Sequence, residues 1–112
     1  MSGTNRHSAV AGLFYPDNPV QLTPMVRGFL DAVPVEEVSP PKAIIVPHAG
    51  YAYSGAVAAR AYARLASLRD RIRRVVLLGP SHRVPLRGIG APTSRCFESP
   101  LGNVEVDRAA IA

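Results

Sequence analysis

A short apolar run that ends at a proline and a histidine constrains the fold of this chain more than any other stretch. Residues 43–46 read Ala-Ile-Ile-Val, and Pro47 and His48 follow directly. A continuous apolar run of this length is typical of a strand buried in a parallel sheet. Pro47 lacks the N–H that would continue the ladder, so we predict that the strand ends there. His48 then lies in a strand-to-helix loop, where open α/β sheets place their ligands.

The same layout recurs further along the chain. Residues 75–78, Val-Val-Leu-Leu, lead through a Gly-Pro pair to Ser81 and His82. Between the two runs, apolar residues recur at helical spacing, which predicts a helix from an N-cap at Ser54 to about Leu68. Strand, helix, strand is a βαβ pattern, in which the strands are parallel. The fold class that we predict is therefore α/β, with a parallel-core sheet and flanking helices.

A further helix is predicted before the first run. Thr23 and Pro24 make a suitable start, with Thr as the N-cap and Pro at the first helical position, and Pro34 ends it. A start at Asn18-Pro19 is the alternative, but Pro24 would then lie inside the helix, where it is costly. Residues 35–41 read as a polar connector.

The last part of the chain shows shorter signals. A third short strand is predicted at 89–91, and residues 96–98 and 104–106 read as two arms of a hairpin. Asp107 is then the N-cap of a helix that stops after one turn. We expect residues 1–8 to be a loose tail and residues 9–112 to be the N-terminal part of a single domain that is incomplete at its C-terminus.

The two loop histidines are the main candidates for chemistry. They are 34 residues apart, too far for a local metal-binding motif. Both, however, follow a predicted parallel strand, and adjacent strands lie about 4.8 Å apart. Two imidazoles at the same sheet edge can converge on one ion, with metal–nitrogen distances of about 2.0–2.1 Å for zinc. The alternative is that His48 and His82 are unrelated loop residues, one capping a helix and one solvated.

Other side chains near these loops have both a functional and a structural interpretation. Tyr51 and Tyr53 could hydrogen-bond a metal-bound ligand or orient His48. In the structural interpretation, one of them packs under the loop and the other is half exposed. Ser81 beside His82 is better interpreted as a loop-shaping residue than as a nucleophile, because no third group orients such a pair. Cys96 lies in an alternating strand pattern and fits a small core residue.

Composition and charge exclude several classes of protein. The apolar content of 47% supports a packed core, and one cysteine excludes an intramolecular disulfide. The first residues lack the apolar segment of a secretory signal, and no run approaches the roughly 20 apolar residues of a membrane span. We therefore expect a cytoplasmic protein. The net charge of +5 includes an arginine cluster over residues 60–74. No recognised nucleic-acid-binding motif accompanies the cluster, so a solvated helix face is favoured over nucleic-acid binding.

Several short motifs together resemble the Memo-like family, whose bacterial and archaeal members are called AmmeMemoRadiSam system protein B. The motifs are Ala-Gly-Leu-Phe-Tyr-Pro at 11–16, Pro-His-Ala-Gly-Tyr-Ala-Tyr-Ser-Gly at 47–55, Gly-Pro-Ser-His at 79–82, Ser-Pro-Leu-Gly at 99–102 and Val-Asp at 106–107. The resemblance runs from about Ala9 to the end of the chain, and the motif at 47–55 is its most specific part.

The resemblance implies a fold like that of the class III extradiol (LigB-like) dioxygenases and a metal, with iron expected, held by His48 and His82. Tyr51, Tyr53 and Ser81 are expected to line the pocket. The family's third ligand is a cysteine in the C-terminal half, which this chain lacks, and Arg83 stands where many relatives have a second histidine. AMMECR-like and radical SAM proteins are the partners that the family association implies.

Two functions from different classes follow from these expectations. The first is a metal-site protein with an iron-dependent redox or dioxygenase-like role, since two histidines and a third ligand leave open positions on Fe(II). The second is a non-catalytic protein that binds a peptide or protein partner in the same pocket. A third function, nucleic-acid binding through the arginines, predicts a steep salt dependence and ranks last.

Overall fold

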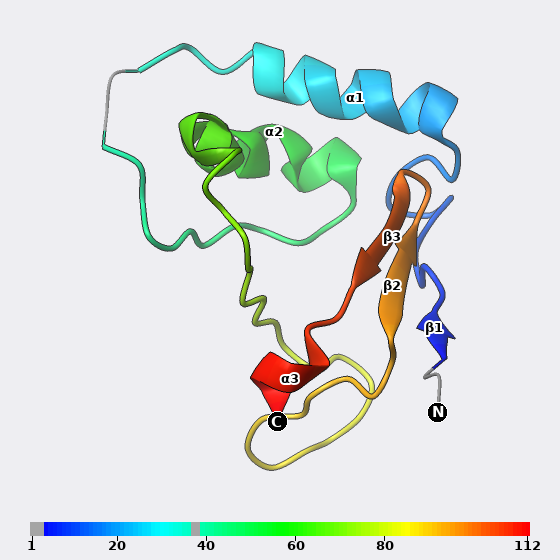
Figure 1. Cartoon of the computed structure of the whole chain (residues 1–112). Helices are drawn as coiled ribbons and strands as arrows, with labels where there is room; N and C mark the ends of the chain where they lie inside the picture. The colour runs from blue at the N-terminus through cyan, green and yellow to red at the C-terminus, as the bar shows by residue number, and fades with distance from the viewer. Residues whose placement is uncertain (1–3, 37–38) are drawn as a thin grey trace.

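A computed structural model of the chain describes residues 4–36 and 39–112, and shows a mixed α/β arrangement of short elements (Figure 1). Residues 1–3 of the expected tail and residues 37–38 of the expected connector lie outside the described residues. The elements in chain order are β1 (Asn5–Arg6), α1 (Pro19–Asp31), α2 (Tyr51–Tyr62), the 3₁₀ helix η1 (Ala63–Leu68), β2 (Cys96–Ser99), β3 (Gly102–Glu105) and α3 (Arg108–Ile111).

Helix α1 starts at the earlier of the two sites that the sequence offers. Asn18 is the N-cap, and its side chain accepts a hydrogen bond of 3.0 Å from the backbone N–H of Gln21. Pro19 occupies the first helical position, where its missing N–H costs nothing. The predicted start at Thr23 is therefore wrong, and Pro24 lies inside the helix. The Asn18 cap and Pro19 at the first helical position stabilise the earlier start, which outweighs the cost of Pro24 in the helix.

Helix α2 also starts before its predicted cap. Gly50 is the N-cap and makes no side-chain cap bond, whereas Ser54 lies within the first turn. The Ser54 hydroxyl donates a hydrogen bond of 2.9 Å to the carbonyl of Ala49, so it ties the helix to the preceding loop instead of capping it. The predicted end near Leu68 is the end of η1, because the α-helix tightens into a 3₁₀ helix after Tyr62.

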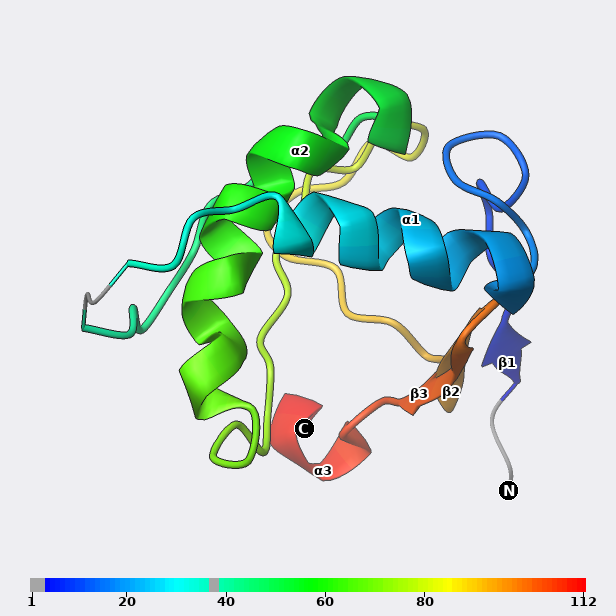
Figure 2. The ribbon, with the colours of Figure 1, turned by 90° about the horizontal axis from the view of Figure 1, so that it is seen from above.

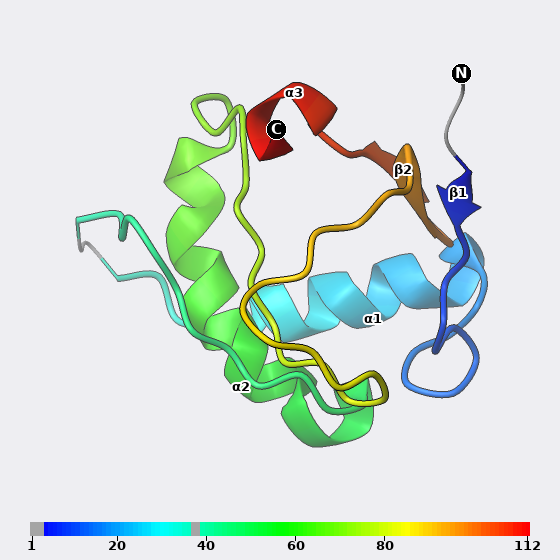
Figure 3. The same ribbon diagram turned by 90° about the horizontal axis from the view of Figure 1, so that it is seen from below.

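The two long helices make the main packing contact of the chain. Figure 2 and Figure 3 show α1 running across α2, with the β2–β3 hairpin near the N-terminal end of α1. Gly55 permits this crossing, because a Cβ on Gly55 would stand 2.7 Å from Cε2 of Phe29. Leu22 on α1 and Ala59 on α2 are buried, with 3% and 5% of their surface exposed. Close approach of the helices thus depends on one missing methyl group.

The sheet is small and lies at the two ends of the described chain. Its strand order is β1-β2-β3, with β1 parallel to β2 and β2 antiparallel to β3. The predicted hairpin is confirmed, with Cys96 opposite Glu105 and a turn in which Gly102 has a φ of 125°. Cys96 is a buried free thiol, as expected for a core residue. The cap at Asp107 is also confirmed, since its side chain accepts a 3.0 Å hydrogen bond from the N–H of Ala110.

The described part of the expected loose tail is attached to this sheet. Asn5–Arg6 forms β1, and the hydroxyl of Ser8 donates a 2.7 Å hydrogen bond to the carbonyl of Glu98. His7 Nδ1 lies 2.7 Å from Oε2 of Glu98, although the His7 side chain is 87% exposed. The polar residues of 4–8 therefore pair with β2, a long-range contact that their composition does not indicate.

The predicted parallel core is not present in the described residues. Residues 43–46, 75–78 and 89–91 belong to no strand. A strand requires a hydrogen-bonded neighbour, and neither 43–46 nor 75–78 takes part in a backbone–backbone hydrogen bond with any residue of the described ranges. The apolar pattern marks segments suited to a sheet, but these segments have no ladder partner here.

The helices of the described segments, 4–36 and 39–112, include none long and apolar enough to cross a membrane.

The Gly55–Phe29 contact predicts opposite effects for two glycine substitutions. Gly55→Ala should lower the free energy of unfolding by about 1–3 kcal/mol, because the new methyl group overpacks the helix crossing. Gly28→Ala is the matched control, since Gly28 lies in α1 with nothing within 4 Å of its Cβ position. It should raise stability by about 0.5–1 kcal/mol. Urea unfolding of both variants provides the measurement, and equal stabilisation by both would show that the helices do not cross at Gly55.

Candidate functional site

The structure brings the two loop histidines together. His48 Nε2 and His82 Nε2 are 3.2 Å apart, and the ring centroids are separated by 5.2 Å at an interplanar angle of 53°. Both residues are exposed. The pair therefore converges from positions 34 residues apart in the sequence, although residues 43–46 and 75–78 form no strand with any part of the chain that the structure describes.

The loop that carries His48 is held in place by the N-terminal segment. The N–H of Tyr51 donates a 2.8 Å hydrogen bond to the carbonyl of Phe14, and a Cβ on Gly50 would lie 3.6 Å from the backbone of Phe14. The segment folds back on itself at Gly12, which has a φ of 82° and donates a 2.7 Å hydrogen bond to the carbonyl of Tyr15. This turn supports the site, a role that the residue pattern alone did not predict. The available signal was the motif at 11–16, in which Gly12 precedes Leu13 and two aromatic residues.

A local turn shapes the loop that carries His82. The hydroxyl of Ser81 donates a 2.5 Å hydrogen bond to the carbonyl of Val84, three residues further on. This contact fits the loop-shaping interpretation of Ser81. The serine hydroxyl is thereby engaged with the backbone of its own turn and orients the segment on which His82 lies.

The distance between the two Nε2 atoms is compatible with ligation of one ion. Two nitrogens at zinc-like distances from a shared ion are about 2.9 Å apart at an octahedral angle and about 3.3 Å apart at a tetrahedral one. The observed 3.2 Å lies between these values. The same distance also fits a direct hydrogen bond, in which one neutral imidazole donates from Nε2 and the other accepts. Both arrangements require that at least one ring keeps its proton on Nδ1.

A complete set of metal ligands is not present in the part of the chain that the structure describes. Among residues 4–36 and 39–112, no three His, Cys, Asp or Glu side chains form a group that could hold an ion. Cys96 is 4% exposed within β2, and His7 lies against Glu98. The histidine pair is thus the only part of the expected ligand set that these residues assemble.

A large cavity lies beside the pair. Its volume is about 1050 Å³, and His48, His82 and Tyr51 line it together with Phe14, Phe29 and Phe97. Arg6 also borders the cavity, with its guanidinium carbon 5.4 Å from the ring centroid of Phe97. The site therefore offers imidazole nitrogens at the edge of a mostly aromatic and aliphatic space. Such spaces commonly bind small molecules or apolar side chains.

The two tyrosines of the loop have different environments. Burial raises the pKa of the Tyr51 phenol, and the nearby phenols of Tyr15 and Tyr62 raise it further. The rings of Tyr51 and Tyr15 are 5.2 Å apart between centroids. Tyr53, in contrast, is 87% exposed. Tyr51 thus combines packing under the loop with a position at the cavity wall.

The raised pKa of Tyr51 predicts a loss of stability at high pH. The folded chain holds the phenolic proton more tightly than the unfolded chain, whose tyrosines have a pKa near 10.0. The free energy of unfolding should therefore decrease as the pH rises above this value. Titration followed by the ultraviolet absorbance of phenolate should show one tyrosine that ionises at a higher pH than the others. Tyr51→Phe should remove this late component of the titration, and Tyr53→Phe should leave it in place. A late component that survives in Tyr51→Phe would contradict the assignment.

Comparisons with known proteins agree with this arrangement of motifs. The family model described as "Memo-like protein" matches residues 6–112. The chain is 42% identical over 106 residues to a "MEMO1 family protein" of Aquifex aeolicus (strain VF5), covering 91% of this chain and 36% of that protein. It is 36% identical to "Protein MEMO1" of Danio rerio, covering 96% of this chain and 35% of the relative. For the Homo sapiens protein of the same name the identity is also 36%, with coverages of 92% and 34%.

The chain thus spans about a third of the length of the curated relatives that it matches. The family model nevertheless matches almost the whole chain, from residue 6 to residue 112. The chain belongs to the Memo-like family.

Proposed function

We propose that this protein binds a non-haem metal ion, with iron the expected ion, through Nε2 of His48 and Nε2 of His82. The observation that carries the proposal is the 3.2 Å separation of the two nitrogens, which are contributed by loops far apart in the sequence. Imidazole nitrogen suits iron, zinc, copper and nickel. The role that we propose for the complete protein is an iron-dependent redox or dioxygenase-like step.

The chain's own residues contribute binding and orientation. To bind a metal ion through Nε2, each imidazole must carry no proton on Nε2. The one proton of the neutral ring then lies on Nδ1. The helix start at Gly50 and the Ser81 turn hold the two loops, and apolar residues of the cavity wall border the pair. A bound iron with two histidine ligands and further open positions would supply a place where small ligands or O₂ can coordinate.

The remaining ligands are proposed to come from protein that corresponds to the other two thirds of the relatives. Two protein ligands are fewer than the three or more of typical sites, so we expect weak binding by this chain alone. In this proposal AMMECR-like and radical SAM proteins remain the partners, and the cytoplasm remains the location. A reducing compartment would keep Cys96 as a thiol and iron as Fe(II).

A non-catalytic function is the second candidate, and the cavity favours it. A space of about 1050 Å³ with three phenylalanines on its wall can accommodate apolar side chains of a peptide. In that case His48 and His82 would hydrogen-bond each other, and the site would recognise its partner without a metal. The two candidates differ in whether the imidazoles respond to a metal ion.

Metal titration followed by NMR distinguishes these candidates. Zn²⁺ is a suitable probe because it is diamagnetic, and Fe²⁺ binding can then be measured anaerobically by elemental analysis. We expect Zn²⁺ to shift the imidazole signals of His48 and His82 together, with a weak dissociation constant. His48→Ala and His82→Ala should each weaken binding at least tenfold, because each leaves a single protein ligand.

His7→Ala is the matched control, because His7 is an exposed histidine that lies against Glu98 in the sheet. It should leave metal binding unchanged. Shifts of the His7 signals alone, or equal loss of binding in all three variants, would contradict a site at His48 and His82. An unchanged spectrum at saturating Zn²⁺ would favour the imidazole–imidazole hydrogen bond and the binding function.

A further inference from the structure

We propose that the cavity beside the histidine pair binds a small molecule with an apolar body and one carboxylate, and that the guanidinium of Arg6 receives the carboxylate. This space, called the histidine cavity below, is the cavity of about 1050 Å³ lined by His48, His82 and Phe97. The inference names the class of ligand that would reach the imidazoles, and only its relevance to a metal there rests on the proposed function. Binding of the carboxylate itself needs no metal.

The pairing of β1 with β2 places Arg6 at the histidine cavity. Arg6 is opposite Phe97 in this parallel pair, and paired residues lie on the same face of a sheet. The guanidinium carbon is 5.4 Å from the centroid of the Phe97 ring, and both residues line the cavity. Alternation along the chain turns His7 and Glu98 to the other face, where they contact each other at 2.7 Å. The carboxylate of β2 is therefore engaged away from Arg6.

The guanidinium of Arg6 is available to a ligand. Within residues 4–36 and 39–112, the arginine side chains with an ion pair or hydrogen bond are Arg64, Arg74 and Arg108, and Arg6 is not among them. Arg6 is exposed, so its N–H groups are accessible from the solvent. A guanidinium presents its donors in one plane and binds a carboxylate through two parallel hydrogen bonds. The side chain thus offers a geometry that matches a carboxylate.

The charges around the histidine cavity favour an anion. Among the described residues that line it, none is Asp or Glu, and Arg6 carries the permanent charge. Walls of one sign concentrate ligands of the opposite sign. A single fixed positive charge is complementary to a monoanion. A phosphate monoester, with a charge of about −1.5 to −2 at neutral pH, matches it less well.

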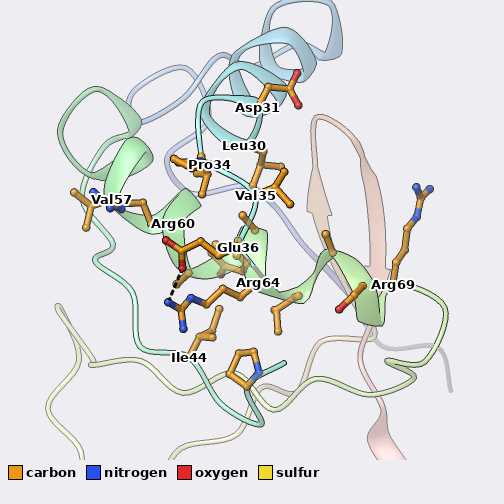
Figure 4. Close-up of a pocket in the computed structure, with 18 of the residues that line it drawn as sticks. Leu30, Asp31, Pro34, Val35, Glu36, Ile44, Val57, Arg60, Arg64 and Arg69 are labelled. Atoms are coloured by element: carbon orange, nitrogen blue, oxygen red, sulfur yellow. Dashed lines mark hydrogen bonds and ion pairs between the residues drawn. The ribbon is translucent and has the colours of Figure 1, made fainter. Parts of the chain in front are cut away.

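A second cavity of the same volume, about 1050 Å³, has a different charge pattern. Side chains of both signs line it, and Figure 4 shows Asp31 and Glu36 near Arg60 and Arg64. Glu36 already forms an ion pair of 3.4 Å with Arg64. Carboxylates in this wall would repel an anionic ligand and compete with it for the arginines. The lining of the histidine cavity carries no such competitor among the described residues.

The remaining lining of the histidine cavity fits an apolar body. Phe29 and Phe97 contribute aromatic rings, and Val46, Leu77 and Leu86 contribute aliphatic side chains. Small-molecule sites typically combine such walls with a few polar groups that fix the orientation of the ligand. Here the polar groups are the guanidinium and the two imidazoles. A ligand held by its carboxylate at Arg6 and by its body on these walls would lie in the same space as the histidine pair.

Binding of phenylacetate and phenylacetamide to this chain without metal tests the proposal. The two probes share one body, and only phenylacetate is charged. We expect phenylacetate to bind about tenfold more tightly in an NMR titration, because its bonds to the guanidinium are charge-assisted. Arg6→Gln should abolish this preference. Arg6→Lys should retain part of it, since Lys keeps the charge but lacks the planar fork.

Arg95→Gln is the matched control. Arg95 directly precedes β2, is exposed and lines neither cavity, so the variant loses the same charge close to the same sheet. It should leave the preference for phenylacetate unchanged. An equal loss of preference in Arg6→Gln and Arg95→Gln would overturn the proposal, because it would show a general effect of net charge.

NOEs in the unsubstituted chain give a second measurement that does not depend on how the variants fold. Bound phenylacetate should show NOEs to the ring of Phe97 and should shift the Nε signal of Arg6. Equal affinity for phenylacetate and phenylacetamide would overturn the proposal, and so would NOEs that exclude Phe97. Tighter binding of benzylphosphonate than of phenylacetate would overturn the choice of a carboxylate.

The outcomes of these experiments separate this inference from the proposed function. A preference for phenylacetate in a chain whose imidazoles ignore Zn²⁺ would support the Arg6 site and contradict metal binding. Zn²⁺ binding by the histidine pair without a preference for phenylacetate would overturn the Arg6 site alone.

Discussion

The hydrogen bond from the N–H of Tyr51 to the carbonyl of Phe14 fixes the geometry on which the site depends. It joins the turn around Gly12 to the first residue of α2, and it thereby sets where the loop with His48 enters the helix. The crossing of α1 over α2 at Gly55 then holds that helix against Phe29. Two contacts therefore fix the position of His48. One is the backbone hydrogen bond to Phe14, and the other is the packing of α2 against Phe29.

This arrangement explains how the two histidines can converge without a formed sheet. Each imidazole lies on a short loop with its own internal bond, Ser54 to the carbonyl of Ala49 in one and Ser81 to the carbonyl of Val84 in the other. Local hydrogen bonds of this kind restrict a loop at little cost in chain entropy, since they close rings of only a few residues. The strands would add rigidity to this geometry, but they are not needed to bring the rings to 3.2 Å.

The sequence predicted best the features that depend on nearby residues. The hairpin from Cys96 to Glu105 and the cap at Asp107 rest on turn and capping chemistry within a few positions, and both are confirmed. The start of α1 differs from the predicted one because the cap at Asn18-Pro19 outweighs the cost of Pro24 in the helix interior. At residues 43–46 and 75–78 the apolar pattern predicted strands, and the structure has none at these residues. A strand, however, is defined by its partner, and no local pattern contains that partner.

The histidine pair and the apolar runs at 43–46 and 75–78 are physically connected, because residues 77–80 and 46–47 lead directly into the two histidines and line the same cavity. A metal ion held between the imidazoles would therefore restrict both loops at once, because each apolar run continues directly into one of the two histidines.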